Sequence, residues 1–187
     1  MQVQANFHHP ARVLLSALCL AAAGAAAASD NASLDVAAGY ADQVGVLAVN
    51  VTFDRAAPLV ERPSWRLGVQ YEFGVTVFEG RRSDVGGYKT LAGFSGVPVV
   101  RVEWPRSEWP VFVEAGLGAM LLTHTKLQLD HQFSTAFQFL SLGGVGVRFG
   151  RDHAYEVGLR LEHMSNADIK GPNNGLTYGV ARFAWRF

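Results

Sequence analysis

Apolar and polar residues alternate along most of this chain with a period of two. From Trp65 to Val75 every second residue is apolar, and the residues between them are charged, polar or glycine. A period of two places successive side chains on opposite faces of a β-strand, whereas a helix needs a period of 3.6. The same pattern recurs in eight segments, at positions 34–40, 47–53, 65–75, 92–104, 111–121, 139–149, 155–161 and 183–187. The sequence therefore predicts an all-β fold.

The length and the charge of these segments favour a membrane barrel over a soluble β-sandwich, which can show the same alternation. Segments of roughly ten residues cross a bilayer when tilted. The polar face carries charges of both signs, as expected of a narrow lumen, and the chain ends on Phe183, Trp185 and Phe187. Such an aromatic end resembles the assembly signal of bacterial outer-membrane barrels. We predict an eight-stranded antiparallel transmembrane β-barrel, whose closure leaves no unpaired edge in lipid and whose interior is filled by side chains.

Composition excludes several classes of function. The 16 basic and 16 acidic residues balance, whereas a nucleic-acid-binding domain needs a basic excess. One cysteine, Cys19, excludes a disulfide framework and a cysteine-based zinc site. His124, His131 and His153 are scattered without ligand spacing, so we expect no metal site and no cofactor.

The first 28 residues are predicted to be a secretory signal peptide. Arg12 precedes an apolar run that extends from Val13 to Ala28, and the run ends in the small residues of an A-x-A cleavage site. A transmembrane anchor is the alternative, but such a helix needs ~20 strongly apolar residues. Residues 29–187 then form the barrel domain, which an export signal places in the bacterial outer membrane.

Counting strands predicts the topology. An even number puts both ends of the barrel domain on the periplasmic side, so the longer connections 79–90, 123–136 and 165–176 face the cell exterior.

Pro98 lies inside a strand segment and removes a ladder donor, which predicts a bulge or an early strand end there. The aromatic residues near the strand ends are expected to form interfacial girdles; they are Trp65, Trp104, Trp109, Tyr155 and Trp185.

A histidine and a serine break the apolar face near residue 163. Parity from Tyr155 points both His163 and Ser165 towards lipid, where polar side chains are rare and usually functional. Residues two apart in a strand lie ~6.6–7 Å apart, so an imidazole base can reach a serine nucleophile, the minimal arrangement for acyl transfer. The site opens on acyl chains, which favours an ester substrate. Polar residues in the headgroup zone are the alternative interpretation.

The residues from His163 to Gly175 resemble a known motif. His163-Met164-Ser165-Asn166-Ala167, followed by Lys170, Pro172-Asn173 and Gly175, is similar to the H-x-S-N-A…K-x-P-N-x-G run of the outer-membrane lipid A 3-O-deacylases (the PagL type). This family consists of eight-stranded barrels that remove the ester-linked acyl chain at the 3 position of lipid A. The resemblance implies that His163 is the base, that Ser165 is the nucleophile, and that Asn166 or Asn173 helps to hold the oxyanion.

One position departs from the family. The family has a glutamate two residues after the glycine of P-N-x-G, and this chain has Thr177 there. Thr177 shares the outward face, so its hydroxyl can accept a hydrogen bond from the imidazole, but it offers no carboxylate. Asp168 is a candidate replacement acid, whereas Glu162 has inward parity. The change also fits an inactive relative.

The expected partners are lipid A in lipopolysaccharide and the outer membrane, with the active site facing the outer leaflet. A homodimer is left open, and nucleic acid is not expected. Arg81, Arg82 and Lys89 either contact lipid A phosphates or form a solvated loop. The alternative function is that of a non-catalytic small barrel with a structural or surface-binding role. A solute channel is disfavoured, because the interior of the barrel is expected to be filled by charged side chains.

Overall fold

The structure is a computed structural model that describes residues 31–41, 43–80, 90–128 and 131–187, together with Ser16, Cys19 and Gly24. The predicted signal peptide and the basic residues Arg81, Arg82 and Lys89 fall outside the described residues. Within the described part of the chain, no helix has the length and apolarity needed to span a membrane.

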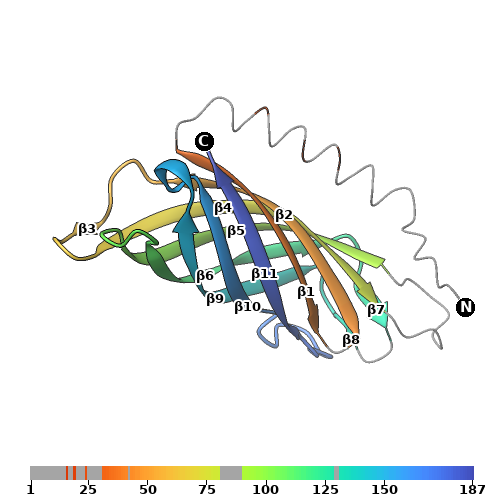
Figure 1. Cartoon of the computed structure of the whole chain (residues 1–187). Helices are drawn as coiled ribbons and strands as arrows, with labels where there is room; N and C mark the ends of the chain where they lie inside the picture. The colour runs from red at the N-terminus through yellow and green to blue at the C-terminus, as the bar shows by residue number, and fades with distance from the viewer. Residues whose placement is uncertain are drawn as a thin grey trace, which may run out of the picture.

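Eight long antiparallel strands make up the described structure and close on themselves (Figure 1). Each strand pairs with the next, and β1 pairs with β11, so that no long strand is left with a free edge. This arrangement confirms the predicted eight-stranded barrel. The strands are β1 (Ala32–Ala41), β2 (Val44–Asp54), β4 (Arg66–Gly80), β5 (Thr90–Trp104), β6 (Val111–Leu122), β9 (Phe137–Phe149), β10 (Tyr155–Ser165) and β11 (Leu176–Arg186).

Short elements lie at the two ends of the barrel. At one end, β3 (Val60–Glu61) pairs with the start of β4, so the long connection between β2 and β4 is partly a hairpin extension. A 3₁₀ turn at Arg151–His153 joins β9 to β10 at this end. At the other end, β7 (Lys126–Gln128) and β8 (His131–Gln132) form a separate two-stranded sheet (Figure 1).

β5 continues through Pro98 without a bulge, so the predicted bulge or early strand end is wrong; the pairing with β6 is interrupted only at Val97 and Pro98. Pro98 is paired with Tyr71 in β4, and on the other side the register between β5 and β6 is the same at Gly96–Ala119 as at Val99–Gly116. A proline removes a donor on one side of its strand only. Gly118 allows the backbones to pass closely here, because a Cβ at this position would lie 2.2 Å from the carbonyl oxygen of Gly96.

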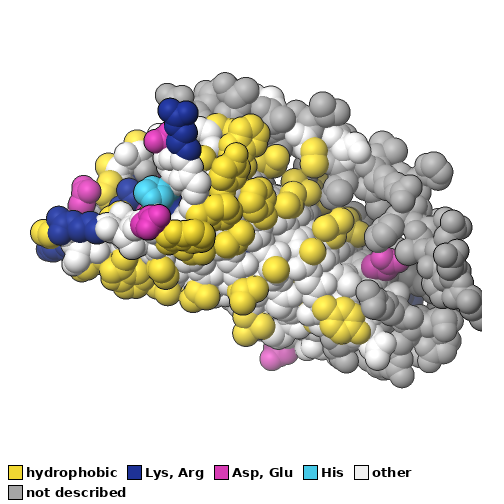
Figure 2. Space-filling view, in the orientation of Figure 1, with side chains coloured by type: hydrophobic (Ala, Val, Ile, Leu, Met, Phe, Trp, Pro, Cys, Tyr) yellow, Lys and Arg dark blue, Asp and Glu magenta, His cyan; other side chains and the backbone are white. Residues whose placement is uncertain are grey.

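The outer wall of the barrel is apolar, as the alternation predicted. Leu117, Leu159 and Leu161 are each more than 60% exposed, which is unfavourable in water and expected in contact with lipid. Hydrophobic side chains spread along the wall in Figure 2, and the lysine, arginine and histidine side chains in this view gather at the end where β3 lies. The exposed aromatic residues Trp104, Trp109, Tyr155 and Trp185 lie at that same end, as expected of an interfacial girdle.

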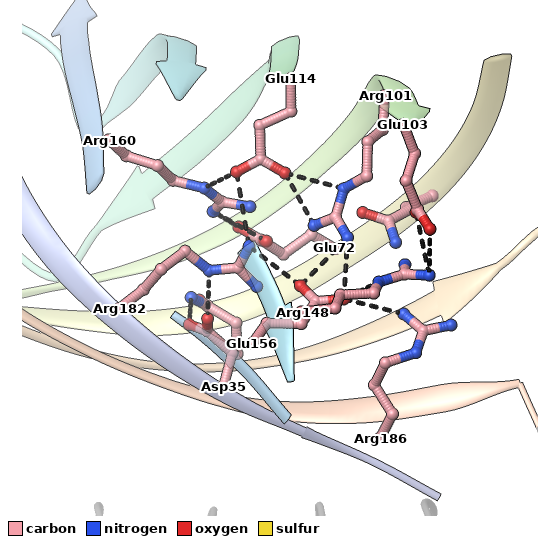
Figure 3. Close-up of polar contacts among 12 residues, drawn as sticks. Asp35, Glu72, Arg101, Glu103, Glu114, Arg148, Glu156, Arg160, Arg182 and Arg186 are labelled. Carbon is pink, nitrogen blue, oxygen red and sulfur yellow. Dashed lines mark hydrogen bonds and ion pairs between the residues drawn. The ribbon is translucent and has the colours of Figure 1, made fainter. Parts of the chain in front are cut away.

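The lumen is filled, and its two halves differ in chemistry. Towards the β7–β8 end it is packed by apolar side chains, among them Phe78, Leu91, Met120 and Met164, none of which is more than 1% exposed. The rest of the lumen holds a connected set of arginine–carboxylate pairs (Figure 3). The apolar side chains fill this half of the lumen, as expected of an eight-stranded barrel.

Glu156 is the most connected carboxylate of the charged half. Its oxygens lie 2.9 Å from Arg101, 2.9 Å from Arg148, 3.2 Å from Arg186 and 3.6 Å from Arg182 (Figure 3). A second carboxylate, Glu114, is similarly shared among three arginines. Buried charges are tolerated only when they are paired in this way.

Glu156→Gln is therefore expected to destabilise the barrel. The substitution keeps the side-chain volume but leaves four arginines short of one negative charge, so the free energy of unfolding in micelles should fall by about 3–5 kcal/mol. The matched control is Glu108→Gln in the exposed turn before β6, which should change it by less than about 0.5 kcal/mol. Equal stability of the two variants would contradict a structural role for the lumenal network.

Candidate active site

His163 and Ser165 lie on the outer wall at the end of β10. His163 is exposed and Ser165 is half-buried, whereas their neighbours Met164 and Glu162 point into the lumen. The predicted outward orientation is thus the one that the structure has. Both side chains continue the outward-facing row formed by Leu159 and Leu161. The C-terminal end of this apolar row on β10 is therefore polar.

The pairing of β10 with β11 places Thr177 beside His163. The two residues are directly opposite in the register, and His163 Nδ1 lies 2.8 Å from Thr177 Oγ1. If Nδ1 carries the ring proton and donates a hydrogen bond to Thr177 Oγ1, Nε2 is unprotonated and has a lone pair that can accept a proton. Within the described residues, the hydroxyl of Ser165 makes no hydrogen bond to the imidazole. Such catalytic hydrogen bonds are often long before substrate binds.

Gly175 packs against both candidate residues. Its φ is +55°, and a Cβ there would lie 3.2 Å from His163 Cε1, 3.5 Å from Ser165 Cβ and 3.1 Å from the carbonyl oxygen of Met164. A side chain would therefore be strained by the backbone and would also press on the imidazole. The glycine of the motif is needed because the returning chain runs directly against the site.

Asn166 and Asn173 connect the loop that follows β10. Asn166 is 1% exposed, its backbone N–H donates to Asn173 Oδ1 at 3.0 Å, and its Nδ2 donates to Ser134 Oγ at 2.9 Å and to the carbonyl oxygen of Lys170 at 2.8 Å. Asn173 Nδ2 donates to Asp168 Oδ1 at 3.0 Å. Both side-chain donors of Asn166 are therefore used inside the loop, and the predicted oxyanion role of these residues stays a prediction.

The other residues considered from the sequence lie elsewhere. Asp168 is bonded to Asn173, and Glu162 lies inside the barrel, so Thr177 is the imidazole's hydrogen-bond partner in the described structure. The His124 and His153 rings contact the backbone oxygens of Thr90 and Glu108. The described residues contain no group of three or more His, Cys, Asp or Glu side chains arranged to hold a metal ion.

Sequence reasoning missed the contribution of the loop between β6 and β9. Phe133 forms an isolated bridge with Asn173, and the Ser134 hydroxyl donates to the carbonyl oxygen of Lys170. No periodicity in residues 123–136 signals these contacts. Ser141 in β9 lies opposite His163, but its hydroxyl donates at 3.5 Å to the carbonyl oxygen of His163 and not to the ring, so it is a neighbour of the site and not part of it.

Together, a closed eight-stranded barrel and an exposed apolar outer wall define a class, the small β-barrels of the outer membrane. The sequence profile of the family described as "Lipid A 3-O-deacylase (PagL)" matches residues 43–186. The chain belongs to the lipid A 3-O-deacylase (PagL) family.

Individual relatives agree with this assignment. The chain is 28% identical over 151 residues to the lipid A deacylase PagL of Pseudomonas aeruginosa, covering 80% of this chain and 83% of that protein. It is 36% identical over 93 residues to the lipid A deacylase PagL of Bordetella bronchiseptica, covering 50% of this chain and 49% of that protein. The crystal structure of the outer membrane enzyme PagL superposes with a TM-score of 0.73 at 22% identity, covering 83% of this chain and 99% of that one.

Gly175→Ala should impair hydrolysis of lipid A more than it impairs folding. The added Cβ would lie 3.2 Å from His163 Cε1, so the ring must shift by about a few tenths of an ångström. A 1 Å misplacement in an active site costs roughly 100-fold in rate, so we expect this smaller shift to lower kcat about threefold to tenfold. The measurement is kcat on lipopolysaccharide, with the fraction of folded barrel as a check. Gly68→Ala is the control, because nothing lies within 4 Å of its added Cβ. If Gly175→Ala kept the wild-type kcat, hydrolysis would not depend on the position of the His163 ring.

Proposed function

We propose that this lipid A 3-O-deacylase uses Ser165 as the nucleophile and His163 as the general base to hydrolyse the acyl ester at the 3 position of lipid A. The observation that carries the proposal is the position of both side chains on the lipid-facing wall, within the family's H-x-S-N-A run. A nucleophile there meets an ester among acyl chains without removing the lipid from the membrane.

The reaction divides into two half-reactions. Ser165 Oγ attacks the ester carbonyl while His163 Nε2 accepts its proton, and the tetrahedral intermediate collapses with the imidazolium protonating the leaving sugar oxygen. A water molecule, activated by the same imidazole, then hydrolyses the acyl-serine. The products are a free hydroxyl at the 3 position of the sugar and a free 3-hydroxy fatty acid, and the enzyme is regenerated.

Thr177 takes the position of the family's glutamate as the group that orients His163. Its Oγ1 accepts from Nδ1 at 2.8 Å, which fixes the ring and leaves Nε2 for Ser165. A hydroxyl lacks the negative charge with which an acid also stabilises the imidazolium. We therefore expect slower chemistry than a carboxylate in this position gives.

The loop after β10 positions the site. Asn166 and Asn173 were predicted to hold the oxyanion, and their hydrogen bonds support the narrower role of fixing the turn that carries Ser165 and Gly175. Asn173 is the less buried of the two amides, and its Nδ2 keeps one hydrogen after donating to Asp168, so it is the amide that we expect to donate to the oxyanion.

The orientation in the membrane is part of the proposal. The girdle of Trp104, Trp109, Tyr155 and Trp185 marks one interface, and His163 lies at the opposite end of β10. With residues 1–28 acting as the export signal and both ends of the barrel in the periplasm, His163 faces the outer leaflet, where lipid A is located. The filled lumen requires the substrate to approach from the side.

Ser165→Ala and His163→Ala should each abolish release of 3-hydroxy fatty acid from lipopolysaccharide. The assay uses purified barrel in micelles, with mass spectrometry of both the lipid A and the fatty acid. The control is Ser141→Ala, which removes a hydroxyl from the same wall directly across from His163 and should leave most of the activity. Activity retained by Ser165→Ala would rule out the proposed nucleophile, and an inactive wild type would support a non-catalytic barrel.

Substitutions at Thr177 test the orienting role. Thr177→Ala should lower kcat about threefold to tenfold, because a hydrogen bond between neutral groups contributes ~0.5–1.5 kcal/mol. Thr177→Glu should raise kcat at least about tenfold, since a carboxylate also stabilises the imidazolium. Rates equal to the wild type for both variants would mean that the contact with His163 Nδ1 has no part in catalysis.

A further inference from the structure

A cavity of about 210 Å³ opens at the end of the barrel opposite His163. It lies between the lumen and the connection that follows β2, and at ~30 Å³ per water molecule it has room for a small hydrated ion. Five arginines line it, namely Arg55, Arg66, Arg101, Arg148 and Arg186, against two carboxylates, Asp54 and Glu103. We propose that this cavity binds a phosphate-type oxyanion from the aqueous phase.

The arginines of the cavity retain donors that the lumenal network does not use. Arg55 is exposed; its backbone N–H donates to the carbonyl oxygen of Val69, but its guanidinium has no hydrogen bond or ion pair within the described residues. Arg66 is bonded to Glu103 at 2.8 Å through Nη2 alone, and its side chain is 39% exposed. Because a guanidinium offers five N–H donors in a planar fork, these two side chains suit the oxygens of phosphate.

A buried acceptor in the same cavity points to an anion that also carries a proton. Gln70 lines the cavity and is 4% exposed, and its Nε2 donates to Asp54 Oδ1 at 2.5 Å. Its Oε1 is buried and has no hydrogen-bond partner in the described structure. A buried acceptor without a donor is unfavourable. Inorganic phosphate retains a P–OH group at neutral pH, whereas sulfate has none, and this group can donate to Oε1 once the Gln70 amide turns towards the cavity.

The position of the cavity identifies the source of the anion. The cavity is lined by lumen-facing residues and by the connection after β2, at an end of the barrel and not through its wall. We therefore assign the anion to the aqueous phase and not to the headgroup of a membrane lipid. The site is also separate from His163, because the apolar half of the lumen lies between them.

Calorimetric titration of the folded barrel in uncharged maltoside micelles, at constant ionic strength, tests the proposal. Inorganic phosphate should bind saturably and about tenfold more tightly than sulfate. Arg55→Ala and Arg66→Ala should each weaken phosphate binding about tenfold, because each removes charged donors to the phosphate oxygens. Removing Arg66 does not leave Glu103 unpaired, because Glu103 also pairs with Arg148. Gln70→Leu should remove the preference for phosphate over sulfate.

The matched control is Arg151→Ala, which removes a fully exposed arginine from the turn at the same end but outside the cavity. Its affinity for phosphate should equal that of the wild type, and Arg55→Ala should release fatty acid at the wild-type rate. Absence of saturable phosphate binding, or unchanged phosphate affinity in Arg55→Ala, would show that the cavity is not a phosphate site. If phosphatidic acid incorporated in the micelles displaced phosphate, the natural ligand would be a lipid headgroup and not an anion from the aqueous phase.

Discussion

The backbone ladder between β1 and β11 is the interaction on which the rest of the structure depends. It joins the first and last long strands in antiparallel register, from Ser33–Arg186 to Tyr40–Gly179, and so removes the free edges that lipid does not tolerate. Once the sheet is closed, each strand side chain points either into the lumen or outward from the wall. In β10 this places Glu156, Arg160 and Glu162 inside and His163 and Ser165 outside. The orientation of the site is therefore a consequence of closure.

The two halves of the lumen support the site in different ways. The apolar half lies behind β10 and β11, where Met164, Leu176 and Tyr178 are all buried, so the residues that alternate with His163, Ser165 and Thr177 are fixed by packing. The charged half adds stability further along the strands, and its arginines and carboxylates have their partners on neighbouring and facing strands. A rigid wall suits a site whose geometry is set by residues on two adjacent strands.

Much of this arrangement was predictable from the sequence, because alternation reports directly on which face is buried. The strand count, the outward parity of His163 and Ser165, and the pairing of Thr177 with the imidazole all follow from period and register. The bulge at Pro98 was predicted wrongly, because the close approach of Gly118 to Gly96 and Val97 depends on a register that one strand alone does not give. The partners of each lumenal arginine were not predictable, since they depend on the shear of the closed barrel. The contacts of Ser134 with the motif loop lacked any periodic signal.

The thirteen residues from His163 to Gly175 thus combine two requirements, a strand end that faces lipid and a loop that returns against it. The central claim is that Ser165 is the reacting nucleophile and that its reactivity depends on His163. A long-chain alkyl fluorophosphonate carried in micelles, followed by peptide mapping, measures this directly. The account predicts one covalent adduct, on Ser165, that is lost in His163→Ala although the barrel remains folded. An adduct on another residue, or equal labelling of Ser165 without the imidazole, would contradict it.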